Sequence, residues 1–149
     1  MDDTKIVIGS ASSAQIILAP RHRTHVGATD YWDGNWVNCT VSVRAGGFRG
    51  EYIASLRAEE FTAFRADLER LHRDLGGAGG FHSMEEWVDI AVSGDGRGHF
   101  KGLCRLRDEA GIGNLLECEV DFDQTDVPQM VEELRRIERV LPVIGDPAG

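Results

Sequence analysis

VNCTVSVRAGGFRGEYIASL, residues 37–56, carries the clearest structural signal in the chain. Apolar residues occupy alternate positions on both sides of Gly46-Gly47, which is the pattern of two half-buried strands. Residues that face each other in a hairpin share one side of the sheet, so odd positions here must meet even ones. A two-residue turn at Gly46-Gly47 does this, because it pairs Ala45 with Phe48 and Val41 with Tyr52. The segment predicts an antiparallel hairpin closed by a type I′ turn.

Weaker signals flank this hairpin. Residues 5–9 and 14–19 read as two short strands, the second ended by Pro20, and residues 21–35 read as polar and irregular. After the hairpin, residues 58–75 predict an amphipathic helix that Gly76-Gly77 ends. Its apolar stripe has steps of three and four and consists of Phe61, Phe64, Leu68, Leu71 and Leu75. The glycines of residues 76–80 predict a flexible connector between two halves of one fold.

The second half predicts three further strands and a helix. Even-numbered apolar residues mark strands at 88–92, 100–106 and 116–122, and this parity requires turns with an odd number of residues. Residues 95–97 fit the first turn, and a turn centred on Gly111 places Arg105 opposite Glu117 and Lys101 opposite Asp121. A last helix is expected from Asp126 to Leu141. The order ββ–ββ–α–βββ–α indicates an α+β fold, mainly an antiparallel sheet of hairpins with two amphipathic helices packed on one face.

Length and composition indicate one globular domain over residues 1–149. The chain is 42% hydrophobic and 28% charged, and a domain of this size buries a core without metal or disulfide staples. The odd set Cys39, Cys104 and Cys118 has no Cys-x-x-Cys spacing, which favours a reducing cytoplasm. Residues 1–5 lack the pattern of a secretory signal, and no apolar run is long enough for a membrane span.

The formal charge of −9 comes from one part of the chain. Residues 108–133 hold nine acidic residues and no lysine or arginine, whereas the remainder balances 16 acids against 16 bases. Such a field repels nucleic acid and anionic membranes and speeds association with a basic partner. We therefore expect a protein partner of basic character, no nucleic acid and no membrane.

Three patterns in the sequence have residue types found in catalytic or metal sites. Asp121-Phe122-Asp123-Gln124-Thr125 has the residue types of a phosphatase nucleophile loop, but only 24 residues follow it and no lysine occurs after Lys101. The row formed by Glu117, Glu119, Asp121 and Asp123 has period two, so its carboxylates do not converge as calcium requires. The five histidines are scattered without ligand spacing. We therefore expect no catalytic residue, no metal and no cofactor.

The segment Tyr31–Trp36 concentrates two of the three tryptophans and one of the two tyrosines. One interpretation is a packing lid over a sheet end. The other is a binding hot spot, which uses the same large and rigid residue types with polar edges. On the second interpretation Trp32, Asp33 and Trp36 contact a partner together with Glu117, Glu119, Asp121 and Asp123.

Several of these motifs together resemble the WapI family of bacterial immunity proteins. The resemblance covers roughly residues 30–141 and rests on residues 31–37, 46–48, 54–57, 94–99 and 121–125. It implies a small cytoplasmic protein that protects its cell from the nuclease-like C-terminal domain of a contact-dependent toxin. The leading hypothesis is therefore a non-catalytic binding protein that blocks such a toxin. A small magnesium-dependent phosphoester hydrolase using Asp121 and Asp123 is one alternative, and a scaffold or oligomerisation domain is the other.

Overall fold

The hairpin at residues 37–56 is confirmed and forms one side of the first of two sheets, up to its edge. A computed structural model describes residues 4–149. The observed register pairs Ala45 with Phe48 and Val41 with Tyr52. The first sheet has the order β1 (Ile6–Gly9), β2 (Gln15–Arg23), β3 (Trp36–Ala45) and β4 (Phe48–Arg57), and the second has β5 (Gly76–His82), β6 (Val88–Asp95), β7 (His99–Arg107) and β8 (Leu115–Asp123). The helices are α1 (Tyr31–Gly34), α2 (Ala58–Asp74) and α3 (Val127–Val140).

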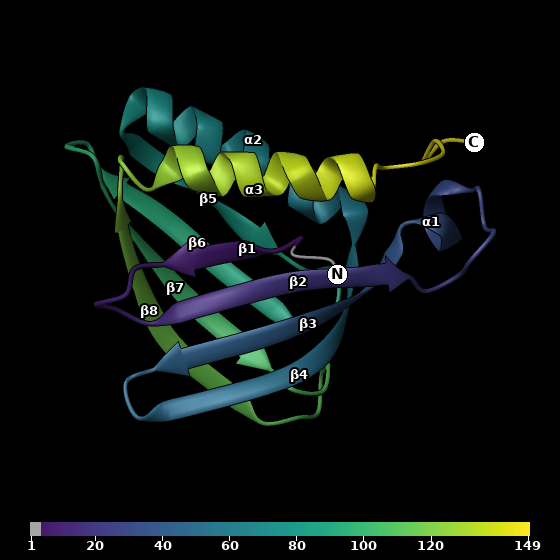
Figure 1. Ribbon diagram of the computed structural model, residues 1–149, viewed down its shortest axis with the longest axis horizontal. Coiled ribbons are helices and arrows are strands. Elements are labelled where there is room, and N and C mark those ends of the chain that lie inside the picture. Colours follow the sequence, from purple (N-terminus) through teal and green to yellow (C-terminus); the bar gives the residue numbers. More distant parts are fainter. Residues whose placement is uncertain (1–3) are drawn as a thin grey trace.

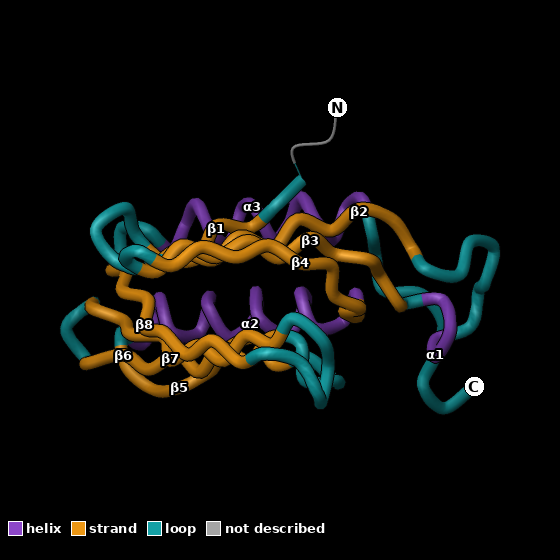
Figure 2. Tube along the Cα trace, turned by 90° about the horizontal axis from the view of Figure 1, so that it is seen from below, coloured by secondary structure: helices purple, strands orange, loops and turns teal. Residues whose placement is uncertain are grey.

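The two sheets stack face to face, and each layer is extended by the helix of the other half (Figures 1 and 2). Helix α2 follows β4 in the chain but lies beside β5, and α3 follows β8 but lies beside β1. The two helices also contact each other, and Arg65 on α2 donates to Glu138 on α3 at 3.1 Å. One core forms between the layers, with buried residues from both sheets and both long helices.

Each long helix supplies a carboxylate to the free edge of the strand beside it. Asp67 on α2 accepts a hydrogen bond from the backbone N–H of Gly80 on β5 at 3.0 Å. Glu133 on α3 accepts one from the N–H of Val7 on β1 at 3.0 Å. Because unpaired backbone groups at a sheet edge invite pairing with other chains, these contacts close two of the four edges.

The prediction of a flexible connector at residues 76–80 is wrong, because these glycines form most of strand β5. A Cβ on Gly79 would lie 2.8 Å from the Asp67 side chain of α2, and one on Gly80 would lie 1.9 Å from the carbonyl oxygen of Ile90. Glycine is therefore required for close packing of β5 against α2 and β6. The second half consequently has four strands, not three.

Three further predictions near the first sheet need correction. Strand β2 continues past Pro20 to Arg23, because a register shift between Pro20 and His22 accommodates the proline. The turn after β3 has a positive φ at Gly46 (61°) only, which suits a type II′ turn, whereas type I′ needs positive φ at both central residues. Residues 31–34, expected to be irregular, form the short helix α1.

The hairpins of the second sheet follow the predicted parity. Arg105 faces Glu117 and Lys101 faces Asp121, as expected for a turn centred on Gly111. The β6–β7 turn is shifted by one residue to 96–98, because the Asp95 carboxylate accepts the N–H groups of Arg97 and His99. The predicted α+β class with antiparallel hairpins is confirmed, with the strands divided between two sheets. None of the helices within residues 4–149 has the length and apolarity of a membrane span.

Candidate partner-binding surface

The aromatic segment Tyr31–Trp36 folds over Arg57, whose side chain is only 1% exposed. The guanidinium carbon lies 5.2 Å, 5.4 Å and 4.8 Å from the ring centroids of Tyr31, Trp32 and Trp36. The guanidinium also donates to the carbonyl oxygens of Tyr31 and Trp32, both at 2.8 Å, and pairs with Glu59. A buried arginine needs such partners because an unpaired charge away from water is costly. The segment is thus a lid over a buried cation.

The C-terminal residues hold this lid from outside. The Asn35 side chain donates to the carbonyl oxygen of Ile144 at 2.9 Å and accepts the N–H of Ile144 at 3.0 Å. Trp36 is half-buried and Asp33 is exposed. Trp32 keeps 51% of its surface exposed, although its indole N–H donates to the carbonyl oxygen of Pro147 at 3.4 Å. Most of the aromatic segment therefore serves packing, and Trp32 presents the largest free aromatic surface.

The acidic row of β8 stands on the outer face of the second sheet, as its period predicts, but two bases and a histidine of β7 lie next to it. Glu117 pairs with Arg105, Glu119 lies 3.7 Å from Lys101, and Asp121 lies 3.5 Å from His99. Asp123 accepts the N–H of Thr125 at 2.9 Å at the entry to α3, and hydrogen bonds from Thr125 lower the pKa of Asp123. The row is therefore partly neutralised by its own sheet.

The two sets of predicted contact residues do not form one surface. Figures 1 and 2 place α1 at one end of the molecule and β8 toward the other. A partner that contacts Trp32 and also the β8 row must therefore span most of the length of the protein.

Other acidic residues gather where the loops at 83–87 and 108–114 approach β4. We call this set the acidic end, and it consists of Glu51, Glu85, Glu86 and Glu109. Within residues 4–149 none of these carboxylates has a salt bridge or hydrogen-bond partner. Glu86 comes near the second loop, since a Cβ on Gly111 would lie 3.7 Å from its Oε1. Bases lie near these carboxylates, with Arg105 and Arg107 beside Glu85 and Glu86 and Arg49 beside Glu51, but within residues 4–149 none of them pairs with a member of the acidic end.

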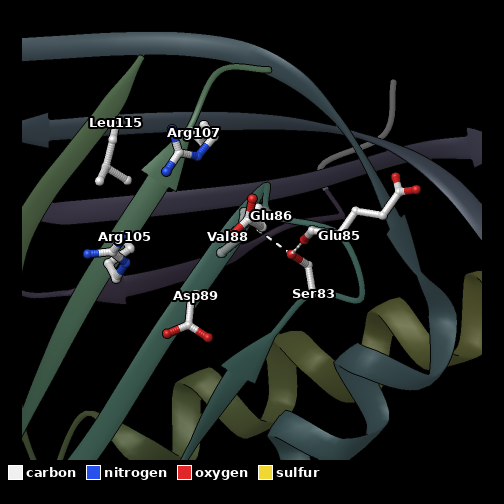
Figure 3. A pocket seen from close by; sticks show the side chains of 8 residues that line it. All are labelled: Ser83, Glu85, Glu86, Val88, Asp89, Arg105, Arg107 and Leu115. Atoms are coloured by element: carbon white, nitrogen blue, oxygen red, sulfur yellow. Dashed lines mark hydrogen bonds between the residues drawn. The ribbon is translucent and has the colours of Figure 1, made fainter. Parts of the chain in front are cut away.

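A polar pocket of about 180 Å³ lies at the acidic end (Figure 3). Glu85, Glu86 and Asp89 line it together with Arg105 and Arg107. In Figure 3 the two arginines come from one strand, β7, whereas the acids come from β6 and the loop before it. Ser83 organises that loop by accepting the N–H of Val88 at 3.1 Å. The mixture of acidic and basic side chains in this pocket suits a polar or ionic group of a partner rather than an apolar ligand.

A second depression, of about 260 Å³, runs along β4 and is less polar. We call it the β4 groove, and its lining includes Phe48, Tyr52, Leu106, Leu115 and Leu116, with Glu51 and Asp108 at the rim. Tyr52 fixes its inner wall, because the hydroxyl donates to the carbonyl oxygen of Trp87 at 2.8 Å and the two rings stack with centroids 6.4 Å apart. A shallower depression continues from it past Trp87 to Glu109 and Ile112.

Two carboxyl groups fix the loops around these depressions. Asp108 accepts the N–H of Asn114 at 2.7 Å, and hydrogen bonds from Asn114 lower the pKa of Asp108. Glu60 accepts the N–H groups of Arg57 at 2.8 Å and Met84 at 2.6 Å, so it ties α2 to the loop at 83–87. Burial raises the pKa of Glu60 to about 7, partly offset by those hydrogen bonds.

Sequence reasoning missed the acidic end because its members come from three distant segments. The charge count singled out residues 108–133, which include Glu109 but not Glu51, Glu85 or Glu86. Only the packing of β4 against the two loops brings them together. No group of three or more His, Cys, Asp or Glu side chains within residues 4–149 is arranged to hold a metal ion.

Fold and surface together define a small α+β protein of two stacked meanders with charged depressions. The chain belongs to the WapI-like immunity protein family, whose model matches residues 7–142. The resemblance noted in the sequence is thereby confirmed over nearly the whole chain. None of the curated proteins compared with the chain matches it. Membership supports a toxin-neutralising role and implies a cognate toxin as partner.

Proposed function

We propose that this protein neutralises the toxin domain encoded beside it by binding that domain without catalysis. Family membership over residues 7–142 is the observation that carries the proposal. We expect the toxin domain to be nuclease-like and therefore basic, because a nuclease must attract phosphate. The expected site of action is the cytoplasm, where the toxin would reach its substrate.

The charge distribution supports binding by electrostatic complementarity. A net charge of −9 and the unpaired carboxylates of the acidic end favour rapid association with a basic domain. The acidic surface would occupy the channel that otherwise receives nucleic acid. Two acidic surfaces are available, the β8 row and the acidic end, and both are proposals for the contact.

Growth protection tests the proposal. The C-terminal domain of the neighbouring toxin gene should arrest growth when expressed alone in a bacterial host, and co-expression of this chain should restore growth. With purified components, inhibition of the toxin should reach its maximum near equimolar amounts, because a binder acts stoichiometrically. Protection by far less than one equivalent would instead indicate turnover, and absence of both complex and protection would refute the proposal.

A phosphoester hydrolase acting through Asp121 and Asp123 makes a different prediction. Magnesium-dependent cleavage of a phosphate ester by the chain alone, lost in Asp121→Asn, would replace the binding proposal. The contacts of Asp123 with Thr125 and of Asp121 with His99 give both residues a structural explanation.

A further inference from the structure

The four edge strands of the two sheets differ in how many of their outward backbone groups have hydrogen-bond partners. Asp67 and Glu133 accept edge N–H groups of β5 and β1, as described above. On β8, the Ser13 hydroxyl accepts the N–H of Asp121 at 3.2 Å and lies 3.4 Å from its carbonyl oxygen. The edge of β4 from Phe48 to Ile53 receives no such contact from residues 4–149. The backbone groups of Glu117 and Glu119 on β8 likewise receive no such contact from the described residues, and of these two open stretches the one on β4 lines the β4 groove.

The backbone groups on that open edge follow from the hairpin. In a two-residue hairpin the residues that flank the turn, Ala45 and Phe48, exchange hydrogen bonds. Alternation then directs the backbone N–H and C=O groups of Arg49, Glu51 and Ile53 away from β3. An added strand would find three consecutive pairing positions there.

The surroundings of this edge combine apolar surface with negative charge. Phe48 is 70% exposed and Ile112 is 80% exposed, and Leu115, which follows Ile112 in the chain, lines the β4 groove. Glu51 lines this groove together with Arg49, and Glu109 lies with Glu51 in the adjoining shallower depression. Within residues 4–149 neither glutamate has a salt-bridge partner. Exposed apolar side chains of this size beside a groove mark interaction sites, and their acidic rim selects for a basic partner.

We propose that the toxin domain docks here by adding an extended basic segment to the edge of β4, with its apolar side chains in the β4 groove. The inference rests on the proposed function and names the surface that performs it. Self-pairing of β4 centred on Glu51 would place the Glu51 carboxylates of two molecules opposite each other, and a second copy is therefore the competing occupant that the test below must reject. A basic segment instead gains main-chain hydrogen bonds for affinity and lysine or arginine contacts for orientation.

The decisive test separates the backbone N–H of Glu51 from its charge. Binding to the catalytically inactive C-terminal domain of the neighbouring toxin is measured by calorimetry for wild type, Glu51→Gln and Glu51→Pro. Proline is tolerated on an edge strand where the N–H faces solvent, so both variants should fold, which thermal unfolding checks. We expect Glu51→Pro to weaken binding about tenfold more than Glu51→Gln. Equal affinities of the two folded variants would overturn the strand-addition proposal.

A matched pair of double variants tests the location. Glu51→Gln with Glu109→Gln removes two charges from the proposed surface, and Glu119→Gln with Asp121→Asn removes two from the β8 row. The Glu51/Glu109 double variant should weaken binding about tenfold and reduce the salt dependence of binding. The Glu119/Asp121 double variant should change the affinity less than about threefold. The reverse order would move the contact to β8 and leave the proposed function standing. If the wild-type chain does not bind the toxin domain at all, both proposals are refuted. If the chain alone forms a dimer and Glu51→Pro abolishes that dimer, the edge of β4 is occupied by a second copy of the chain instead.

Discussion

Replacing Arg57 by alanine should be among the most destabilising single changes outside the apolar core. The substitution removes a side chain that is 1% exposed, together with its hydrogen bonds to two carbonyl oxygens and its contacts with three aromatic rings. It also leaves Glu59 without its partner, although Oε1 of Glu59 is already buried without a hydrogen bond. Removing one member of a buried ion pair costs about 3–5 kcal/mol, and we expect Arg57→Ala to fall in that range.

Urea and thermal unfolding followed by tryptophan fluorescence measure this loss, since Trp32 and Trp36 stand over the guanidinium. For a chain of this length, 3–5 kcal/mol corresponds to a fall in Tm of roughly 6–20 °C. Arg57→Lys should lose about half as much, because an ammonium keeps the charge but cannot bridge two carbonyl groups as a planar fork does. The control is Arg105→Ala, which breaks an exposed pair and should cost less than about 1 kcal/mol. A loss for Arg57→Ala no larger than that of the control would refute the assignment of the lid.

Three further changes test the packing. Gly80→Ala should destabilise the fold by about 3 kcal/mol or more, because its Cβ would overlap the Ile90 carbonyl, whereas Gly47→Ala meets no atom within 4 Å and should be nearly neutral in urea unfolding. Glu60→Gln should remove a pH dependence of stability. Because the pKa of Glu60 is raised in the folded protein, the stability of the wild type declines as pH rises from about 4.5 to about 7. Urea titrations at successive pH values should show no such decline for the variant. Glu133→Ala, which removes the acceptor of the Val7 N–H, should lower stability by about 1 kcal/mol and speed amide exchange at Val7.

Local patterns predicted the two long helices and the registers of β3 with β4 and of β7 with β8, because alternation, parity and turn length are encoded in neighbouring residues. They failed at Gly76–Gly80, where composition suggests flexibility. There the glycines satisfy a tertiary requirement, the close approach of α2 and β6 to β5, and only the packed structure contains that information. Pro20 misled in a similar way, since a bulge keeps β2 continuous.

The candidate contact surface was predictable only in part. The position of the β8 acids on an outer face followed from period two, and the same register placed Lys101 and Arg105 among their neighbours. The sequence left open whether Tyr31–Trp36 is a lid, and Arg57 decides it because a single buried cation organises all three rings. Glu51, Glu85, Glu86 and Glu109 had no common signal, since their proximity depends on how two loops and β4 pack.

The exchange of helices between the layers gives the molecule the architecture of a domain-swapped dimer contained in one chain. The long helix that follows each set of four strands packs beside the sheet formed by the other set. Asp67 on α2 and Glu133 on α3 each accept a backbone N–H from the edge strand of that sheet. Neither half therefore contains the helix that covers the edge of its own sheet. If one half unfolds, the edge strand of the other half loses its helix. Such reciprocal dependence favours a single all-or-none unfolding transition, and a chain cut before Gly76 should refold only when both fragments are present together.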